Sequence, residues 1–222
     1  MSETVDPWVS EKQAAGAAVA LVVEAGMRIG IGSGSTVTHF ISALARRHLQ
    51  IRCVAASPES DRLAREAGLH VKPFDVLDRL DLAVDGADQV ASDLWLVKGG
   101  GGAHTREKVV AAAAERFVVV VSSNKLVEGL KPPVPLEILE FGLGATLREL
   151  GELGPVETRP GPTTPDGHRL VDYLGPVDDP AVLAAFFHTI PGVVSHGLFA
   201  PRLVSEVIIG RRYGATERWQ KE

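Results

Sequence analysis

The sequence predicts an α/β protein built from a mainly parallel, Rossmann-like sheet with helices on both faces, plus a smaller α+β ferredoxin-like domain. Apolar runs alternate with helix-like segments from residue 10 to residue 122, which is typical of parallel sheets covered by helices. Runs such as 117–121 contain no polar residue and suit strands buried on both faces. After a proline-rich joint at 131–135 the expected order becomes β-α-β-β-α-β.

The first part of the chain is predicted to alternate strands and helices. Ser10 is the expected N-cap of an alanine-rich helix, and Thr105 is the expected N-cap of another. We expect helices at 10–25, 36–47, 58–67 and 105–116. We expect strands at 28–31, 51–56, 71–73, 80–84, 94–97 and 117–122.

The second part is predicted to form the smaller domain, with 160–167 as its hairpin loop. We expect its strands at 134–140, 155–159, 169–174 and 193–199, and its helices at 143–151 and 180–190. A last strand at 206–209 is expected to return to the first sheet. The predicted domains are therefore 1–130 with 203–222, and 131–202.

Composition excludes several classes of protein. Of the 222 residues 45% are hydrophobic and 23% are charged, as in ordinary globular proteins. A net charge of −5 argues against nucleic acid or an acidic membrane surface as a partner. The single cysteine, Cys53, lies in an apolar run and is interpreted as a buried packing residue. With no signal-like N-terminus and no apolar run long enough to span a membrane, we expect a cytoplasmic protein.

Residues 30–36 read Gly-Ile-Gly-Ser-Gly-Ser-Thr between a predicted strand and a predicted helix. Free amides, hydroxyls and the positive helix end would together bind a phosphate. A tight turn with capping hydroxyls is the alternative. A dinucleotide fingerprint fits poorly, because Ser35 stands where Gly or Ala is needed and no carboxylate ends the next strand.

Asp85 and Asp88 flank Gly86 and Ala87 directly after the apolar strand 82–84. Carboxylates at the C-terminal end of a parallel strand lie where open α/β sheets bind ligands. They could hold sugar hydroxyls, a metal ion or a lysine. An Asp-Gly turn in which one carboxylate caps the next segment is the alternative.

Residues 98–108 read Lys-Gly-Gly-Gly-Gly-Ala-His-Thr-Arg-Glu-Lys and are the most informative stretch. Lys98 and the glycine amides could neutralise a developing oxyanion, and Glu107 could serve as a base. A structural Glu107 that complements the helix dipole is the alternative.

Two lysines, Lys125 and Lys12, could reach an anionic group or could simply be solvated. Lys125 follows the strand 117–122, and Lys12 lies in the first predicted helix. Seven histidines show no metal-ligand spacing, so no metal site is predicted, and only His104 is expected to border a site.

The chain resembles type A ribose-5-phosphate isomerase over nearly its whole length. The matching motifs are separated and occur in the same order: Gly32-Ser33-Gly34-Ser35-Thr36, Asp85-Gly86-Ala87-Asp88, Lys98-Gly99-Gly100-Gly101, Thr105-Arg106-Glu107-Lys108, Ser123-Asn124-Lys125, Ile190-Pro191-Gly192-Val193-Val194 and Gly197-Leu198-Phe199. Two residues depart from the family pattern: Gln89 replaces an acidic residue, and His104 stands where an apolar residue is common.

The resemblance implies interconversion of D-ribose 5-phosphate and D-ribulose 5-phosphate through an enediolate, without a cofactor. Glu107 would move the proton, Lys98 would stabilise the enediolate oxygen, and Asp85 and Asp88 would orient hydroxyls and assist ring opening. The substrate-binding residues would be Ser33, Gly34, Ser35, Thr36, Asp85, Gly86, Ala87, Asp88, Lys98, Gly99, Gly100, Gly101, Lys125 and Lys12. The family further implies a homodimer or homotetramer.

Other functions use similar sheets. A coenzyme A transferase-like enzyme would use a glutamate as a covalent nucleophile, and a sugar-phosphate deaminase or lactonase relative would be another enzyme class. A sugar-phosphate sensing domain would be non-enzymatic. The presence of both Lys98 and Glu107 and the negative net charge argue against a DNA-bound sensor.

Overall fold

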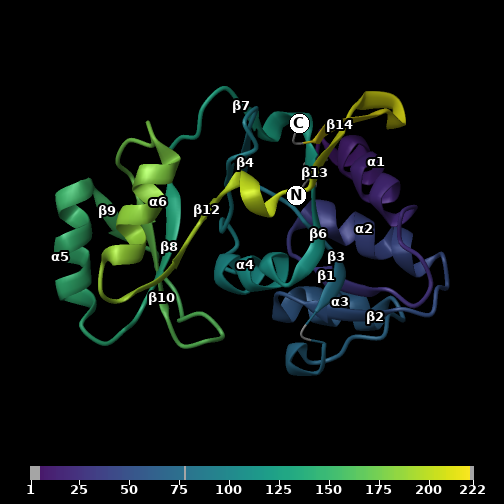
Figure 1. Ribbon diagram of the computed structural model, residues 1–222, viewed down its shortest axis with the longest axis horizontal. Coiled ribbons are helices and arrows are strands. Elements are labelled where there is room, and N and C mark those ends of the chain that lie inside the picture. The colour runs from purple at the N-terminus through teal and green to yellow at the C-terminus, as the bar shows by residue number, and fades with distance from the viewer. Residues whose placement is uncertain (1–5, 78, 221–222) are drawn as a thin grey trace, which may run out of the picture. The chain divides into compact units, whose positions relative to one another are not determined.

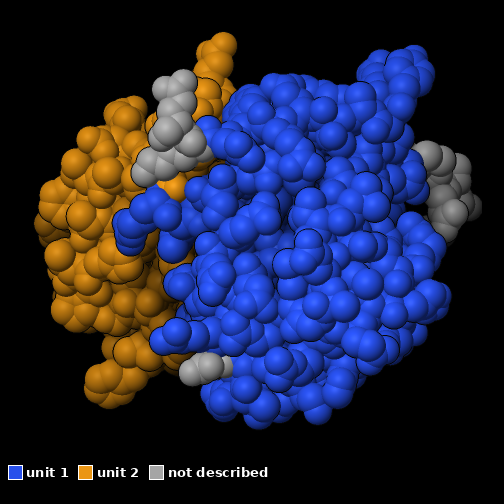
Figure 2. Space-filling model, turned by 45° about the vertical axis from the view of Figure 1, so that its right-hand side comes forward, with its two compact units in different colours: residues 1–86, 109–126, 202–222 blue, residues 87–108, 127–201 orange. Residues whose placement is uncertain are grey.

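The computed structural model describes residues 6–77 and 79–220. The chain divides into two compact units, which Figure 2 colours separately. Unit 1 contains residues 1–86, 109–126 and 202–222, and unit 2 contains residues 87–108 and 127–201. The predicted first domain includes residues 87–108, whereas this division places them in unit 2. The limits of the two domains therefore stay a prediction.

Unit 1 is built on a six-stranded sheet in the order β14-β13-β6-β3-β1-β2 (Figure 1). Neighbouring strands from β13 to β2 are parallel, and only β14 pairs antiparallel, with β13. This sheet confirms the mainly parallel fold class and the predicted return of the chain's last part to the first sheet. The strands are β1 (Arg28–Ile31), β2 (Arg52–Ala55), β3 (Leu80–Asp85), β6 (Ala114–Ser122), β13 (Glu206–Gly210) and β14 (Thr216–Gln220).

Helices cover both faces of this sheet, as the residues of β1 demonstrate. Ile29 and Ile31 are fully buried in a core shared with α1, α2 and α3. Gly30 points to the other face, where a Cβ would lie only 2.5 Å from Val110 of α4. The helices are α1 (Val9–Ala20), α2 (Ser35–Ala45), α3 (Pro58–Glu66) and α4 (His104–Ala112).

Unit 2 contains the predicted β-α-β-β-α-β arrangement as an antiparallel sheet in the order β11-β8-β10-β9. Its core includes Phe187, which meets Tyr173 edge to face with ring centroids 5.2 Å apart. Asp179 caps α6 by accepting hydrogen bonds from two backbone amides. The elements are β8 (Val134–Ile138), α5 (Leu143–Leu153), β9 (Val156–Thr158), β10 (Arg169–Tyr173), α6 (Pro180–Thr189) and β11 (Val193–His196).

A third sheet corrects the prediction of one strand at 193–199. The segment forms two strands in different sheets, β11 and β12 (Leu198–Phe199), with Gly197 between them. The Gly197 amide donates to the Pro135 carbonyl, and its carbonyl accepts from the Lys98 amide at 2.8 Å. The other strands of this sheet are β5 (Leu96–Val97), β4 (Gln89–Ala91) and β7 (Leu126–Val127).

Several predicted boundaries were wrong. The helix predicted at 105–116 ends at Ala112, because Ala114 and Arg116 pair with β3 in the sheet. The strand predicted at 71–73 is reduced to a single bridge between Val71 and Cys53. Strands β4, β7 and β14 were not predicted. Short 3-10 helices complete the described chain: η1 (Phe74–Val76), η2 (Ser123–Lys125), η3 (Pro201–Leu203) and η4 (Arg212–Gly214).

Among the described residues, no helix combines the length and the apolar character needed to cross a bilayer.

Candidate active site

In unit 1, the glycine–serine loop after β1 is built around the carboxylate of Asp85. Asp85 is 2% exposed, and its Oδ1 accepts hydrogen bonds from the amides of Ser33 at 3.0 Å and Gly86 at 2.7 Å. A Cβ on Gly32 would lie 1.9 Å from the carboxyl carbon of Asp85, so only glycine fits there. Asp85 therefore shapes the loop that was predicted to bind phosphate.

A positive charge lies beside the start of α2. Gly34 occupies the N-cap position with φ 95°, a conformation that favours glycine. Ser35 is the first residue of α2, and its Oγ accepts a hydrogen bond from Lys12 Nζ at 2.8 Å. Lys12 also pairs with Asp6 at 2.6 Å, and this contact holds the pKa of Asp6 below its ordinary value. An ammonium group, a hydroxyl and a helix N-terminus thus converge, as anion binding requires.

Glu11 is a site-supporting residue that sequence analysis missed. It is 3% exposed in α1, and its Oε2 accepts from both the amide of Ser123 at 2.7 Å and the Ser123 hydroxyl at 2.6 Å. These bonds fix the start of η2, which ends at Lys125, to Glu11 of α1. A glutamate near a helix start ordinarily indicates dipole complementation, so the sequence held no clear signal of this contact.

In unit 2, Lys98 and Glu107 form a buried ion pair. Lys98 Nζ lies 3.1 Å from Glu107 Oε2, and each side chain is 4% exposed. Lys98 follows β5, Glu107 lies in the first turn of α4, and the glycine run connects the two elements. The Lys98 ammonium also lies 5.4 Å from the centre of the Phe199 ring, a cation–π contact. An acid–base group and a cation are thereby held together in a desolvated place.

The glycine run itself is fixed by side chains. The Gly100 amide donates to Asp88 Oδ2 at 2.8 Å. Gly99 has φ 104°, and a Cβ there would lie 2.7 Å from His104 Nδ1. Gly102 has φ 77° and closes a turn by donating its amide to the Gly99 carbonyl at 3.0 Å. The run is therefore a shaped loop whose positive φ angles require glycine.

The start of α4 differs from the prediction. The helix begins at His104, so Thr105 lies inside it and does not serve as its N-cap. The Thr105 hydroxyl instead donates to the buried carboxylate of Glu137, which also binds Thr164 at 2.7 Å and His168 at 2.9 Å. This network ties the first turn of α4 to β8 and to the hairpin loop of unit 2.

The two departures from the family pattern have structural roles. His104 is completely buried against Gly99, and burial, helped by the charge of Lys108, lowers its pKa to about 3. Gln89 binds the backbone of Lys131 twice, donating to its carbonyl at 2.7 Å and accepting from its amide at 2.8 Å. An acidic residue at position 89 could not donate the first of these bonds.

The remaining predictions concern reactive groups. Cys53 is buried, and burial raises its pKa to about 12, which confirms a packing role. Within residues 6–77 and 79–220, no group of three or more His, Cys, Asp or Glu residues could hold a metal ion.

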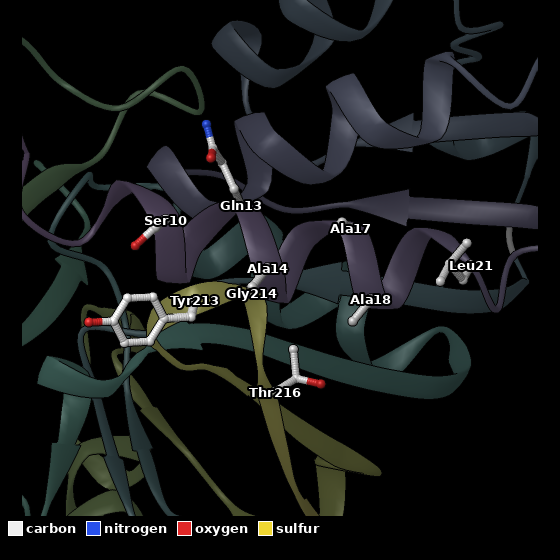
Figure 3. Close-up of a pocket in the computed structure, with 9 residues that line it drawn as sticks. All are labelled: Ser10, Gln13, Ala14, Ala17, Ala18, Leu21, Tyr213, Gly214 and Thr216. Carbon is white, nitrogen blue, oxygen red and sulfur yellow. The ribbon is translucent and has the colours of Figure 1, made fainter.

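Figure 3 shows a pocket of unit 1 that contains none of the predicted site residues. It lies between α1 and the turn that leads into β14, and it offers alanine and leucine side chains with no charged group. Its chemistry does not suit a phosphorylated ligand. The lining residues are Ser10, Gln13, Ala14, Ala17, Ala18, Leu21, Tyr213, Gly214 and Thr216.

Comparison with known proteins identifies a family. Residues 52–214 match the family described as ribose 5-phosphate isomerase A (phosphoriboisomerase A). Ribose-5-phosphate isomerase A of Afipia carboxidovorans is 44% identical over 216 residues, which cover 90% of this chain and 92% of the relative. The crystal structure of ribose 5 phosphate isomerase A from Neisseria gonorrhoeae matches with TM-score 0.91 and 33% identity, covering 96% and 97% of the two chains.

A further solved structure is that of a D-ribose-5-phosphate isomerase in complex with phospho-erythronic acid. It matches with TM-score 0.89 and 34% identity, covering 95% of this chain and 98% of that chain.

The buried histidines predict how stability depends on pH. Burial lowers the pKa of His104 to about 3 and that of His196 to about 2, whereas an unfolded histidine titrates near 6.5. The unfolded chain therefore binds more protons in this range. The free energy of unfolding should be highest above pH 6.5 and should fall as the pH decreases toward 5.

Urea unfolding of wild type, His104→Leu and the exposed control His70→Leu, at pH 5.0 to 7.5, checks this dependence. His104→Leu should lose about a third to a half of the histidine-linked slope between pH 6.5 and 5, because His196 and, less deeply buried, His39 also have lowered pKa values. His70→Leu should keep the wild-type slope. A His104→Leu slope parallel to that of wild type would show that this ring is protonated in the folded protein.

Proposed function

The chain belongs to the ribose 5-phosphate isomerase A family, and from this membership we propose that it interconverts D-ribose 5-phosphate and D-ribulose 5-phosphate in the non-oxidative pentose phosphate pathway. It is an aldose–ketose isomerase. Family membership therefore favours this activity over a coenzyme A transferase, a deaminase or lactonase, and a sensing domain.

Glu107 is the proposed base. It takes the proton from C2 of the open-chain aldose, which leaves an enediolate; the proton held by the carboxyl exchanges in part with solvent, and Glu107 then delivers a proton to C1, while a second proton passes from O2 to O1. The observation that carries this assignment is the buried contact of 3.1 Å between Glu107 and Lys98. A carboxylate beside a fixed cation, both shielded from water, suits proton abstraction next to a carbonyl.

Lys98 is proposed to stabilise the negative charge that develops on the enediolate oxygen. Its ammonium group is 4% exposed, and a charge acts more strongly in a site from which water is excluded. Amides of the glycine run would assist as donors, with the exception of the Gly100 amide, which is bound to Asp88. Asp85 and Asp88 are proposed to orient sugar hydroxyls and to help the ring form of the substrate open.

The phosphate is proposed to bind at the start of α2. Support comes from Lys12, which lies 2.8 Å from the Ser35 hydroxyl, and from the helix N-terminus itself. The further proposed contacts are Ser33, Gly34, Thr36 and Lys125. Phospho-erythronic acid, bound by a related isomerase, is itself a phosphorylated sugar acid.

Holding the phosphate limits the positions that the reacting carbons can occupy, so it should contribute to turnover as well as to affinity.

We further propose that the enzyme works without a metal ion or cofactor, as a homodimer or homotetramer in the cytoplasm. Light scattering after gel filtration tests the oligomeric state, and a monomer at assay concentrations would contradict it.

Removing the base should stop the reaction without preventing binding. Glu107→Gln should lower kcat by about a thousandfold, because the amide cannot accept the C2 proton, while calorimetry should still detect ribose 5-phosphate binding. Glu152→Gln, an exposed position on α5, is the matched control and should keep wild-type kcat. Turnover of Glu107→Gln near the wild-type rate would eliminate Glu107 as the base.

Removing Lys12, the lysine proposed to bind the substrate phosphate, should weaken inhibition by inorganic phosphate. Lys12→Met loses a charge-assisted hydrogen bond, so the Ki of phosphate against ribose 5-phosphate should rise by about 10- to 100-fold. Lys72→Met, a lysine of the same unit without an assigned role, controls for the change in net charge. An unchanged Ki for Lys12→Met would place the phosphate elsewhere.

A further inference from the structure

The guanidinium group of Arg159 binds the backbone of the glycine run. Its Nη1 donates to the carbonyl of Gly99 at 2.8 Å and to that of Gly100 at 3.2 Å. The other side of the same guanidinium forms a two-pronged ion pair with Asp172, with both distances 2.7 Å. Asp172 lies on β10 and Arg159 directly follows β9, so the antiparallel pair β9–β10 carries this clamp.

Fixing these two carbonyls also fixes two amides. A peptide unit is planar and trans, so its N–H points away from its C=O. The Gly99 carbonyl shares a plane with the Gly100 amide, and the Gly100 carbonyl shares a plane with the Gly101 amide. The Gly100 amide indeed points away from Arg159 and donates to Asp88 at 2.8 Å. Arg159 thus sets the direction of the amides of Gly100 and Gly101.

The glycine run needs such a clamp more than other loops do. Glycine has the largest choice of backbone conformations, and four consecutive glycines lose the most entropy when they are ordered. Donors that stabilise a developing charge are effective only when their directions are set beforehand. The planar, rigid fork of an arginine suits this task because it can hold a carboxylate and two carbonyls together.

We propose that Arg159 is a positioning residue that fixes the glycine run so that the Gly101 amide is directed at the enediolate, while the Gly100 amide stays bound to Asp88. This role rests on the proposed function, because it assumes that the Gly101 amide faces the developing charge. Arg159 acts through Gly99 and Gly100, and Asp172 holds Arg159 in place.

Steady-state kinetics with ribose 5-phosphate tests the proposal. Arg159→Ala should lower kcat by about 10- to 100-fold, the range expected for displaced donors, while KM should change less than about threefold. Added guanidinium ion should restore part of kcat in Arg159→Ala. Asp172→Asn, which keeps Arg159 but weakens its hold, should lower kcat by a smaller factor.

Arg169→Ala is the matched control. Arg169 also joins a carboxylate and a glycine carbonyl in unit 2, but its partners are Glu140 and Gly161, outside the glycine run. It should keep kcat within about twofold of wild type. Equal losses of kcat in the two variants, an effect confined to KM, or wild-type kcat in Arg159→Ala would each overturn the proposal.

Hydrogen exchange of the Gly100 amide, followed by NMR, separates this proposal from the proposed function. Exchange should accelerate in Arg159→Ala and stay unchanged in Arg169→Ala, whatever the substrate is. Unchanged exchange in Arg159→Ala would overturn the clamp. If wild type failed to isomerise ribose 5-phosphate, the proposed function would fall, while faster exchange in Arg159→Ala would leave the clamp standing.

Discussion

The buried ion pair between Lys98 and Glu107 is the interaction on which the catalytic account depends. Each side chain is 4% exposed, and burying either charge alone would be costly. Their pairing offsets that cost, and the proposed mechanism uses the two groups as the base and the cation that act on one substrate carbon and its oxygen. The surrounding structure holds both members of the pair in place. The Gly197 carbonyl accepts a hydrogen bond from the Lys98 amide, and the Thr105 hydroxyl binds α4 to Glu137.

The same device recurs in both units, where a carboxylate binds backbone amides and so shapes a loop. Asp85 holds the amides of Ser33 and Gly86, Asp88 holds that of Gly100, and Glu11 holds that of Ser123. Amides bound in this way become fixed dipoles, which need little reorganisation when charge appears on a ligand. Acidic residues beside a proposed anion site are thus explained by the loops that they order.

The architecture could be predicted from the sequence because the longer helices and strands have recognisable local sequence patterns. The apolar run of β6, the proline-rich joint and the β-α-β-β-α-β order predicted the main sheets, and β1 was predicted at its observed bounds. Strands β4 and β7 were not predicted, because they are only three and two residues long, too short to show a periodicity. The break at Gly197 depends on contacts with Lys98 and Pro135, which no local pattern encodes.

The residues of the candidate site also fall into those that the sequence predicted and those that it did not. Sequence motifs predicted four residues of the candidate site: Lys98, Glu107, Asp85 and Ser35. They could be predicted because glycines, hydroxyls and charged side chains are unusual at the ends of predicted strands. The residues that support them could not be predicted from the sequence, for a physical reason. Arg159 lies 59 residues from Gly100, and Glu11 lies 112 residues from Ser123, so only the folded chain brings them together.

The most direct measurement of the central claim is proton NMR of ribose 5-phosphate in D₂O with wild type and with Lys98→Ala. If Glu107 carries the proton beside Lys98, wild type should place deuterium at C1 of ribulose 5-phosphate and at C2 of the remaining aldose. Lys98→Ala should slow this exchange and turnover by the same factor. Ketose that forms at the wild-type rate without deuterium, or exchange in Lys98→Ala as fast as in wild type, would contradict the account.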